Sequence, residues 1–386
     1  MNESRLEFVR EAQRRANTFT ALCRQYGIAR KTGYKWLDRA RQEGLRGLGE
    51  HSRRPHRSPE QLDETTVCEL GKLKLAHMRW GPRKIRVVYE RIHGMAPSLS
   101  SCHRVLQKLG LVQRRRRRVR RTAALLDRRV VVSAPNDLWT VDFKGWWLAR
   151  NGERCEPLTV CDAHSRYVLA TIVVQQTSLQ AVKAVFIELF KRYGLPKAIR
   201  SDNGSPFASA SAPLGLSQLS AWWISLGIDV IRGRPGCPQD NASHERMHGD
   251  IAAEIAQYVQ PDRRAQQAGL DLWRQEYNEV RPHETLRNKT PAELYRRSER
   301  RYYEQEPEYG PGFLTRKVST TGRIKWHRQS LFISAALTGH DLGLRRMIDN
   351  RYEVWLYHLL IGTFDPQTYA FQVAPSGDLE RARLSA

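Results

Sequence analysis

Apolar positions recur with two different periods along this chain, and the change of period divides it. As far as about residue 110 they follow one another at helical spacing, three or four residues apart. From Asn136 onward short runs rich in β-branched and aromatic residues predominate, with helical stretches between them. The pattern predicts an all-helical N-terminal region followed by a mixed region of strands and helices.

Residues 18–43 have the pattern of two helices joined by a tight turn. Phe19 and Leu22 lie on one apolar face, Gly27 ends the first helix, and a second helix begins near Ala29. This order is typical of a DNA-binding helix-turn-helix, although an ordinary helical hairpin has the same outline. The basic face of the second helix favours DNA, and its candidate contacts are Arg30, Lys31, Thr32 and Lys35.

A second helical unit follows a linker rich in Gly, Pro, Ser and Arg. Helices are predicted over 64–78, 82–92 and 98–109, with Pro82 in a first helical position and Ser98 as a cap. Two tandem units would bind a longer DNA site than one unit can. The candidate DNA contacts of the second unit are Arg83, Lys84, Ser101, His103 and Arg104.

The mixed region begins with three strands, of which the second and third meet at a turn over 162–165. Helix and strand then alternate, with helices predicted over 178–193, 216–226 and 243–257 and strands over 198–201 and 228–232. Three antiparallel strands followed by such an alternation indicate an α/β sheet with helices packed on its faces.

The last part of the chain has a helical pattern first and a strand pattern after it. Residues 271–297 are predicted to be helical, with an interruption at the segment PHETLRNKTP. From Pro311 the chain returns to strands, with a turn at Asp349–Asn350, and a small SH3-like β-barrel is expected there.

These transitions predict a multidomain protein: an all-α tandem helix-turn-helix region, an α/β core and a C-terminal β-barrel. The expected segments are a first helix-turn-helix domain (1–50), a linker (51–62), a second helix-turn-helix domain with a basic run (63–130), the α/β core (131–262), a helical extension (263–310) and the barrel (311–386).

Charge is distributed very unevenly. The formal net charge is +24, and residues 1–130 hold 32 Lys and Arg against 12 Asp and Glu. The basic run contributes Arg114, Arg115, Arg116, Arg117, Arg118, Arg120 and Arg121. A solvated linker or an anionic-membrane patch would also be basic, but the patterned helices beside the run favour binding to double-stranded DNA.

Other classes of protein are disfavoured by composition. The six cysteines are scattered without a CxxC pair, so neither a zinc ribbon nor a disulfide framework is expected. The N-terminus is charged from its third residue, and no apolar run approaches the ~18 residues that span a membrane. We expect no membrane association and a cytoplasmic, nucleoid-associated location.

Three acidic residues stand out in the α/β core. Asp142 interrupts the strand-like segment LWTVDFKGWW, where an unpaired carboxylate is costly to bury. Asp202 directly follows a short strand, at the edge where such sheets place functional groups, and Glu245 lies in the first turn of a helix. Each has an ordinary alternative: an edge-strand acid, an Asp-Asn-Gly turn, and a glutamate that complements the helix dipole.

Together the three acids suggest a metal site. Three converging carboxylates cannot all ionise without cations, and oxygen ligands suit divalent metal. Two Mg²⁺ ions about 4 Å apart, or Mn²⁺ ions in their place, would activate an attacking oxygen and stabilise the leaving oxygen of a phosphodiester.

In these features the chain resembles the bacterial insertion-sequence transposases, whose integrase core is related to that of retroviral integrases. The resemblance lies in five successive segments, WTVDFKGWW, DAHSRYV, RSDNGSPF, RPGCPQDNASHERMHGDI and EVRPHETLRNKTPAE. It implies a ribonuclease-H-like core in which Asp142, Asp202 and Glu245 match the catalytic Asp-Asp-Glu metal ligands. It also extends over the flanking regions, with helix-turn-helix units in place of the zinc-binding domain of retroviral integrases.

The spacing departs from the family pattern at one point. Between Asp202 and Glu245 lie 42 residues, more than in the best-known members, and the excess is expected in a loop after Phe207. Asp240 is therefore the alternative third ligand, although it lies in a Pro-Gly loop before the helix.

Residues beside these acids are candidates for supporting roles. Lys144, Asn203 and Arg246 are predicted to contact DNA or to orient the carboxylates, and His248 to position the attacking group. Asp162 and His164 belong to a turn near the site, where a structural role is the alternative.

The resemblance implies a DNA transposase that binds the terminal inverted repeats of its element, cleaves their 3′ ends and joins them to target DNA. Because two ends are joined together, a homo-oligomer on DNA is expected. The alternatives are a non-catalytic DNA-binding regulator derived from such an enzyme and a plain metal-dependent nuclease of the same fold.

Overall fold

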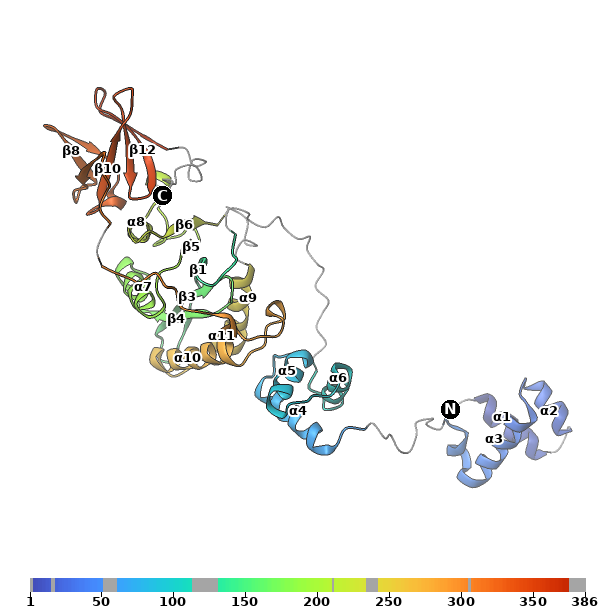
Figure 1. Cartoon of the computed structure of the whole chain (residues 1–386). Coiled ribbons are helices and arrows are strands. Elements are labelled where there is room, and N and C mark those ends of the chain that lie inside the picture. The colour runs from blue at the N-terminus through green and yellow to red at the C-terminus, as the bar shows by residue number, and fades with distance from the viewer. Residues whose placement is uncertain are drawn as a thin grey trace. The chain divides into compact units, whose positions relative to one another are not determined.

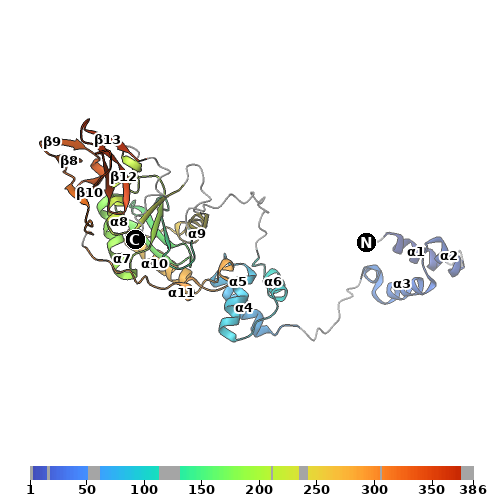
Figure 2. The same cartoon turned by 45° about the horizontal axis from the view of Figure 1, so that its top comes forward.

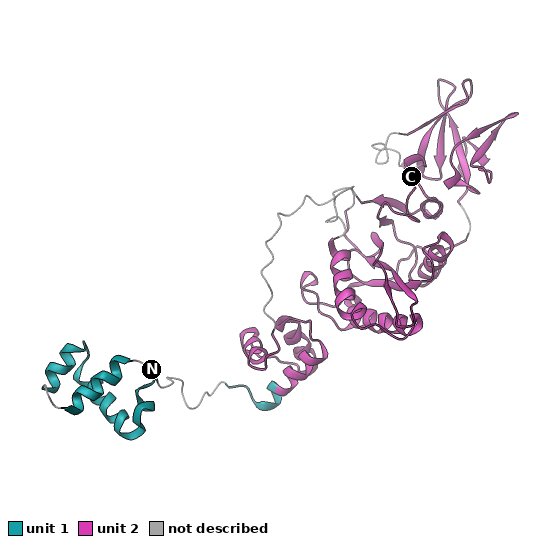
Figure 3. Ribbon diagram, turned by 180° about the vertical axis from the view of Figure 1, so that it is seen from behind, with its two compact units in different colours: residues 1–67 teal, residues 68–386 magenta. Residues whose placement is uncertain are grey.

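The computed structural model describes residues 3–14, 18–50, 61–112, 131–209, 212–233, 242–304 and 307–374. By its contacts the chain forms two compact units, Met1–Val67 and Cys68–Ala386, coloured separately in Figure 3. The predicted basic run over 114–121, the alternative ligand Asp240 and most of the first linker lie outside the described residues. No described helix is both long and apolar enough to cross a membrane.

The first unit is a small helical domain. Its helices are α1 (Glu3–Arg14), α2 (Phe19–Gln25) and α3 (Arg30–Glu43), followed by the 3₁₀ turn η1 (Gly44–Leu48). The buried core consists of Phe8, Val9, Leu22, Cys23 and Leu48. The predicted pair of helices is confirmed as α2 and α3. The additional helix α1 was not predicted, because few of its residues are apolar.

The second helix-turn-helix domain consists of α4 (Glu64–Ala76), α5 (Pro82–His93) and α6 (Leu99–Lys108). Pro82 opens α5, and the hydroxyl of Ser98 caps α6 by accepting from the backbone N–H of Ser101 at 3.1 Å. The buried core of the domain consists of Leu70, Trp80, Ile85, Val88, Tyr89, Cys102 and Leu106. All three predicted helices are confirmed to within a few residues.

The α/β core is built on a sheet whose first three main strands are antiparallel. The strands are β1 (Leu138–Phe143), β2 (Trp147–Leu148), β3 (Arg154–Asp162), β4 (Val168–Val174), β5 (Ala198–Ser201) and β6 (Asp229–Arg232). Strand β3 lies between β1 and β4 and pairs antiparallel with both, whereas β5 runs parallel to β1 and to β6. This mixed sheet confirms the predicted ribonuclease-H-like arrangement (Figure 1).

Helices cover both faces of this sheet. The side chains of α7 (Leu179–Tyr193) and α8 (Gln218–Ser225) share one buried cluster with Trp139 and Val141 of β1. On the other face α9 (Ala242–Ile251), its π-helical continuation η4 (Ala252–Ala256) and α10 (Arg263–Glu279) pack on Cys161 and Val168. The 3₁₀ turn η5 (Glu284–Leu286) and the short helix α11 (Pro291–Leu294) follow α10. Figure 2 shows α7 and α10 beside the sheet from a second direction.

The C-terminal region is rich in β-structure. Its strands are β7 (Phe313–Lys317), β8 (Arg323–Trp326), β9 (Gln329–Phe332), β10 (Asp341–Arg346), β11 (Tyr352–Leu356), β12 (Leu359–Asp365) and β13 (Ala370–Val373). Five of them form a sheet in the order β13-β12-β11-β10-β7, and β8 pairs with β9. The predicted strands are confirmed, but the barrel is not shown, because the described strands do not close on themselves.

The C-terminal sheet packs against the α/β core. Ala221 and Ile224 of α8 share a buried cluster with Leu344, Val354 and other apolar residues of the sheet. The predicted loop after Phe207 contains the 3₁₀ turn η2 (Pro213–Gly215), and Leu216 just beyond it joins the same cluster. A further 3₁₀ turn, η6 (Ala335–Leu337), contributes the buried Leu337.

Candidate functional site

Two of the three candidate acids lie at the carboxyl ends of neighbouring parallel strands. In the β1–β5 pair Thr140 is opposite Arg200, and each acid follows two residues later, Asp142 on β1 and Asp202 just after β5. Parallel strands end at the same edge of a sheet, so the register directs both carboxyl groups to one place. Asp142 is partly buried, and Asp202 is exposed.

The face of β1 that carries Asp142 is the one that meets helix α9. Side chains alternate along a strand, so Trp139 and Val141 enter the cluster under α7 while Thr140 and Asp142 face the other way. The Thr140 hydroxyl lies 2.8 Å from Nδ1 of His244 on α9. This contact places the first turn of α9, and with it Glu245, beside the edge where the two aspartates lie.

One hydroxyl group, that of Thr159, connects both histidines of α9 to the strand of Asp142. Thr159 Oγ1 lies 2.8 Å from the backbone oxygen of Asp142 and 2.7 Å from Nε2 of each of His244 and His248. A carbonyl oxygen only accepts hydrogen bonds, so the single hydroxyl proton is directed to Asp142. Both neutral imidazoles then donate their Nε2–H to Thr159, which leaves Nδ1 of His248 unprotonated; Nδ1 of His244 accepts from the Thr140 hydroxyl, which lies 2.8 Å from it and 3.3 Å from the backbone oxygen of Cys161.

Burial keeps the two rings neutral. It holds the pKa of His244 well below its usual value, and the neighbouring His248 lowers it further. Burial also lowers the pKa of His248 to about 4, and Lys144 contributes in the same direction. The unprotonated Nδ1 of His248 lies 3.8 Å from a carboxylate oxygen of Asp142, so the ring presents a lone pair toward the acidic edge.

The electrostatics of Asp142 show that the three acids act on one another. Burial raises the pKa of Asp142 to about 6, and the negative charges of Asp202 and Glu245 raise it as well. The backbone N–H of Phe143 and the ammonium of Lys144 oppose this shift. Because the three carboxylates repel one another, a cation bound at this edge of the sheet would stabilise their ionised form.

The donor set suits a hard divalent cation in kind and in charge. Three carboxylates supply the oxygen ligands that Mg²⁺ prefers, and the charges of Asp202 and Glu245 add to the effect of burial in raising the pKa of Asp142. Across the described ranges, however, no three His, Cys, Asp or Glu side chains are already gathered closely enough to hold a metal. A bound ion would therefore have to draw the carboxylates closer together.

The predicted supporting residues lie around this edge. Lys144 is partly buried and acts electrostatically on both Asp142 and His248. Asn203 is exposed and donates from its side-chain amide to the backbone oxygen of Gly233 at 3.1 Å, and Arg246 is exposed on α9. Whether these residues contact DNA stays a prediction.

Asp162 has a structural role instead. Its fully buried carboxylate accepts from the backbone N–H groups of Asn136 and Ser165, both at 2.7 Å, and from the Ser165 hydroxyl at 2.5 Å. These bonds close the turn between β3 and β4, so the alternative interpretation of Asp162 holds. His164 lies in the same turn and is partly buried.

The predicted DNA contacts of the helix-turn-helix units are placed in two ways. Arg30, Lys31 and Lys35 are exposed near the start of α3 with Thr32 between them, and on α6 His103 and Arg104 are exposed beside Ser101. In α5, by contrast, Arg83 pairs with Glu284 of the α/β core at 3.2 Å, and burial lowers the pKa of Lys84.

Several residues of this site are not distinctive in the sequence. His244, Thr140 and Thr159 were not singled out, because a threonine within a strand carries no distinctive signal. The spacing of His244 and His248, four residues apart on a predicted helix, was the available sign that both rings lie on one face.

The sequence of the chain agrees with this architecture. The integrase core domain family matches residues 132–238 and 226–291, a homeodomain-like domain matches 32–106, and a helix-turn-helix domain matches 4–56. The chain therefore contains an integrase core domain preceded by helix-turn-helix domains, as its fold indicates.

Its relatives are proteins of bacterial insertion elements. It is 28% identical over 239 residues to the insertion element IS407 31.7 kDa protein of Burkholderia multivorans, which covers 61% of this chain and 82% of that protein. It is 27% identical over 283 residues to the insertion element IS476 39.2 kDa protein of Xanthomonas euvesicatoria, covering 72% and 79%. A shorter match, 33% over 117 residues, covers 30% of this chain and 6% of the Gag-Pol polyprotein of Koala retrovirus.

Among solved structures, the HTLV-2 integrase catalytic core domain in complex with magnesium matches 42% of this chain and 98% of its own, with 16% identity and a TM-score of 0.34. The simian T-cell lymphotropic virus intasome in complex with a PP2A regulatory subunit matches 77% and 99%, with 16% identity and a TM-score of 0.38. The relationship rests on the sequence matches.

Proposed function

We propose that this protein is a DNA transposase. Its helix-turn-helix units bind the terminal inverted repeats of a mobile element, and Asp142, Asp202 and Glu245 catalyse 3′-end cleavage and strand transfer into target DNA. The observation that supports this most directly is the parallel register of β1 and β5, which brings Asp142 and Asp202 to one edge of the sheet, beside the first turn of α9 that carries Glu245. The acids come from three elements far apart in sequence, and the charges of Asp202 and Glu245 both act on Asp142.

The first reaction is hydrolysis at the end of the element. Water attacks the phosphorus in line with the bond to the 3′ oxygen; that bond breaks, and the element keeps a free 3′-hydroxyl while the flanking strand keeps the 5′-phosphate. Divalent ions held by Asp142, Asp202 and Glu245 would supply the positive charge that stabilises the attacking and leaving oxygens.

The second reaction uses the same site. The freed 3′-hydroxyl attacks a phosphodiester of the target, a new bond forms to the phosphorus, and the bond to the target's own 3′ oxygen breaks. One phosphodiester is exchanged for another, so the joining step needs neither ATP nor a covalent bond to the protein.

The chain's own residues prepare this edge for the reaction. Thr159 fixes His248 by accepting from its Nε2–H, so the other ring nitrogen faces Asp142. Lys144 counteracts the repulsion among the acids, as its effect on the pKa of Asp142 shows.

Double-stranded DNA is the proposed partner in two roles, as element end and as target. The basic excess of residues 1–130 supports phosphate neutralisation by the N-terminal third of the chain. Because the two ends of an element are joined together, we propose that the active form is a homo-oligomer assembled on DNA.

The function is tested with a duplex that carries the inverted repeat flanking the gene. The wild-type protein is expected to nick the 3′ end with Mg²⁺ or Mn²⁺ and to join it to a second duplex. Asp142→Asn should lower both rates by at least about a thousandfold, because a neutral amide neither holds nor compensates the cations. Affinity for the same duplex should stay within about twofold.

Three results would contradict the proposal. Asp142→Asn protein that still cuts and joins would remove the acid from the reaction, and wild-type protein that binds the repeat without cutting it would identify a regulator. Protein that cuts without joining would identify a nuclease.

A further inference from the structure

The second helix-turn-helix domain meets the α/β core through faces of opposite charge. At its rim Arg83 pairs with Glu284 at 3.2 Å and Arg91 pairs with Glu293 at 2.9 Å. The guanidinium of Arg91 also donates to the backbone oxygen of Asn288 at 3.0 Å. These side chains are largely exposed, and such pairs are individually weak, so the loss of one pair would change little; reversing both arginine charges, by contrast, would place like charges together across the contact.

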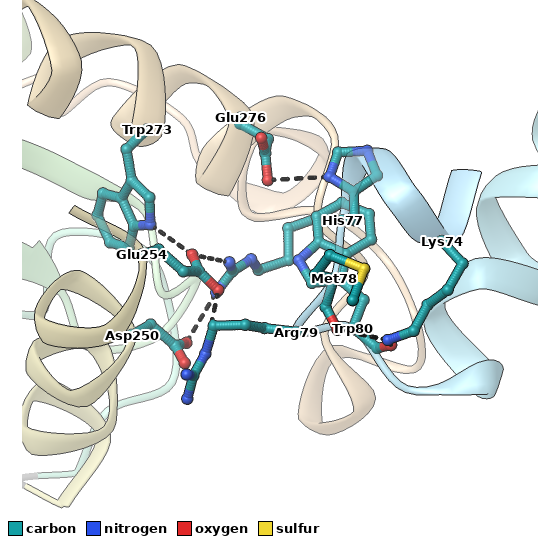
Figure 4. Close-up of polar contacts among 10 residues, drawn as sticks. Lys74, His77, Met78, Arg79, Trp80, Asp250, Glu254, Trp273 and Glu276 are labelled. Carbon is teal, nitrogen blue, oxygen red and sulfur yellow. Dashed lines mark hydrogen bonds and ion pairs between the residues drawn. The ribbon is translucent and has the colours of Figure 1, made fainter. Parts of the chain in front are cut away.

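The centre of the contact is a buried arginine. Arg281, just beyond α10, is 1% exposed. Its guanidinium donates to a carboxylate oxygen of Asp250 at 2.8 Å and to Glu254, which also accepts from the indole N–H of Trp273 at 2.7 Å. Figure 4 shows Asp250, Glu254 and Trp273 facing the turn that joins α4 to α5.

Aromatic rings from both domains enclose the same guanidinium. Its central carbon lies 5.6 Å from the ring centre of Trp80, 6.0 Å from that of Trp273 and 5.3 Å from that of Tyr277. Trp80 stacks on His77, whose Nδ1 lies 3.4 Å from a carboxylate oxygen of Glu276. A cation held between rings away from water is attracted more strongly than one at an exposed surface.

Trp80 contributes both to the core of the second helix-turn-helix domain and to the contact with Arg281. It is part of the buried core of the second helix-turn-helix domain, with Leu70, Ile85 and Leu106 of all three helices. Movement of that domain therefore carries the indole ring with it, and the ring is in contact with Arg281.

The acids that hold Arg281 lie on the helix of the third candidate catalytic residue. Asp250 is in α9 and Glu254 in its continuation η4, five and nine residues beyond Glu245. Helix α9 and η4 are continuous in the chain. The contact therefore joins the DNA-binding domain to the element that positions Glu245.

This contact occupies one basic face of the second domain and leaves another available. Arg83 and Lys84 on α5 lie among the acids of the core, and burial and the charge of Arg281 both lower the pKa of Lys84. On α6, His103 and Arg104 are exposed. Helix α5 thus faces the core, and α6 is the exposed basic helix of this domain; DNA contact by Arg83 and Lys84 stays a prediction.

We propose that Arg281 is a positioning residue that couples the second helix-turn-helix domain to the helix of Glu245, so that DNA bound on α6 restrains α9. The effect of bound DNA rests on the proposed function. The contact of Arg281 with Trp80, Asp250 and Glu254, called the clamp below, does not. Coupling of this kind requires a continuous series of contacts, and it has to be measured directly. The contacts that lead from α6 through Trp80 and Arg281 to Asp250 form such a series.

The clamp is tested first without DNA, by hydrogen exchange of the full chain. Arg83→Glu with Arg91→Glu reverses two rim charges and should speed exchange of residues 77–81 and 281–293 by at least about fivefold. Adding Glu284→Arg and Glu293→Arg restores opposite charges and should restore slow exchange. Unchanged exchange in the first variant, or no recovery in the second, would overturn the clamp.

The coupling is tested with a duplex of random sequence as the probe. In the wild type, bound DNA should slow exchange of residues 242–256. Arg281→Lys keeps the charge but loses the planar fork and the stacking, so DNA should bind within about twofold of the wild-type affinity without slowing α9. Arg274→Lys on α10 is the matched control and should behave as the wild type.

The outcomes separate the two proposals. Slowing of α9 that persists in Arg281→Lys would overturn the coupling, because DNA would then act on that helix by another route. If wild-type protein bound no duplex at all, the proposed function would fail while the DNA-free arm still decided the clamp.

Discussion

At the scale of single residues, the hydroxyl of Thr159 is the point on which the candidate site depends. It donates to the backbone of Asp142 and accepts from both histidines of α9, so it connects two strands and one helix. The aspartates were predictable because an acid within or directly after an apolar strand is conspicuous. Thr159 was not, because its role arises only when β1, β3 and α9 are brought together.

Replacing Thr159 with valine is expected to destabilise the protein. Valine has nearly the same shape but leaves the Nε2–H groups of His244 and His248 without an acceptor, which should cost about 1–3 kcal/mol in the free energy of unfolding. Urea denaturation measures this, and Thr159→Ser should remain close to the wild type. Equal stability of the valine variant would show that the hydroxyl does not hold the network.

A second residue, His283, is expected to make stability depend on pH. Burial, followed by the charges of Lys84 and Arg281, lowers the pKa of His283 to about 3. Below about pH 6.5 the His283 imidazole is protonated in the unfolded chain but stays neutral in the folded protein. The contribution of His283 to the free energy of unfolding should therefore be fully present above that pH. It should be lost as the pH falls toward 3, by up to about 1.4 kcal/mol per pH unit.

The comparison with His283→Gln isolates that contribution. Unfolding free energies measured between pH 7 and pH 4 should fall less steeply in the variant. The slope of the unfolding free energy against pH should be smaller by the equivalent of one bound proton. An identical slope in both proteins would mean that the imidazole titrates alike in the folded and unfolded chains.

At the scale of elements, helix α8 has a double role that its pattern disclosed only in part. The predicted helix over 216–226 was confirmed, but its sequence did not show which neighbours cover it. Trp223 faces the core of the α/β sheet, whereas Ala221 and Ile224 face the C-terminal sheet. A helix that is apolar on both sides has to be buried on both sides.

Truncating Ile224 tests this arrangement. Ile224→Ala should cost about 2–5 kcal/mol and Ile224→Val about 0.5–1.5 kcal/mol, because each leaves a cavity in proportion to the atoms removed. Since the side chain is 1% exposed within the shared cluster, hydrogen exchange should rise in the C-terminal strands and in α8 together. Separate unfolding of the strands with α8 unaffected would contradict the shared core.

The C-terminal strands show where pattern reasoning ends. Their alternation predicted strands and turns well, since these depend on neighbours in sequence. Closure into a barrel depends on register and twist between distant strands, which the alternation does not encode. The described sheet is open, and β8 and β9 form a separate pair.

At the scale of the whole molecule, order along the chain and charge distribution were informative, and contact between domains was not. The basic excess of residues 1–130 indicated the DNA-binding region, and the family matches place helix-turn-helix domains there. Nothing in the pattern of α5 distinguished an arginine that meets DNA from one that meets a glutamate of the core. That distinction required Glu284 and Glu293, about two hundred residues away, to be placed beside it.

The central claim is that Asp142, Asp202 and Glu245 form one cation site, and Mn²⁺ binding to the full chain tests it most directly. Calorimetric titration at pH 7.5, above the pKa of Asp142, should show binding that Asp142→Asn, Asp202→Asn and Glu245→Gln each weaken by at least about tenfold. Asp240→Asn and the distant Asp271→Asn should bind as the wild type does. Wild-type affinity in Glu245→Gln, or a loss in Asp240→Asn, would contradict the account.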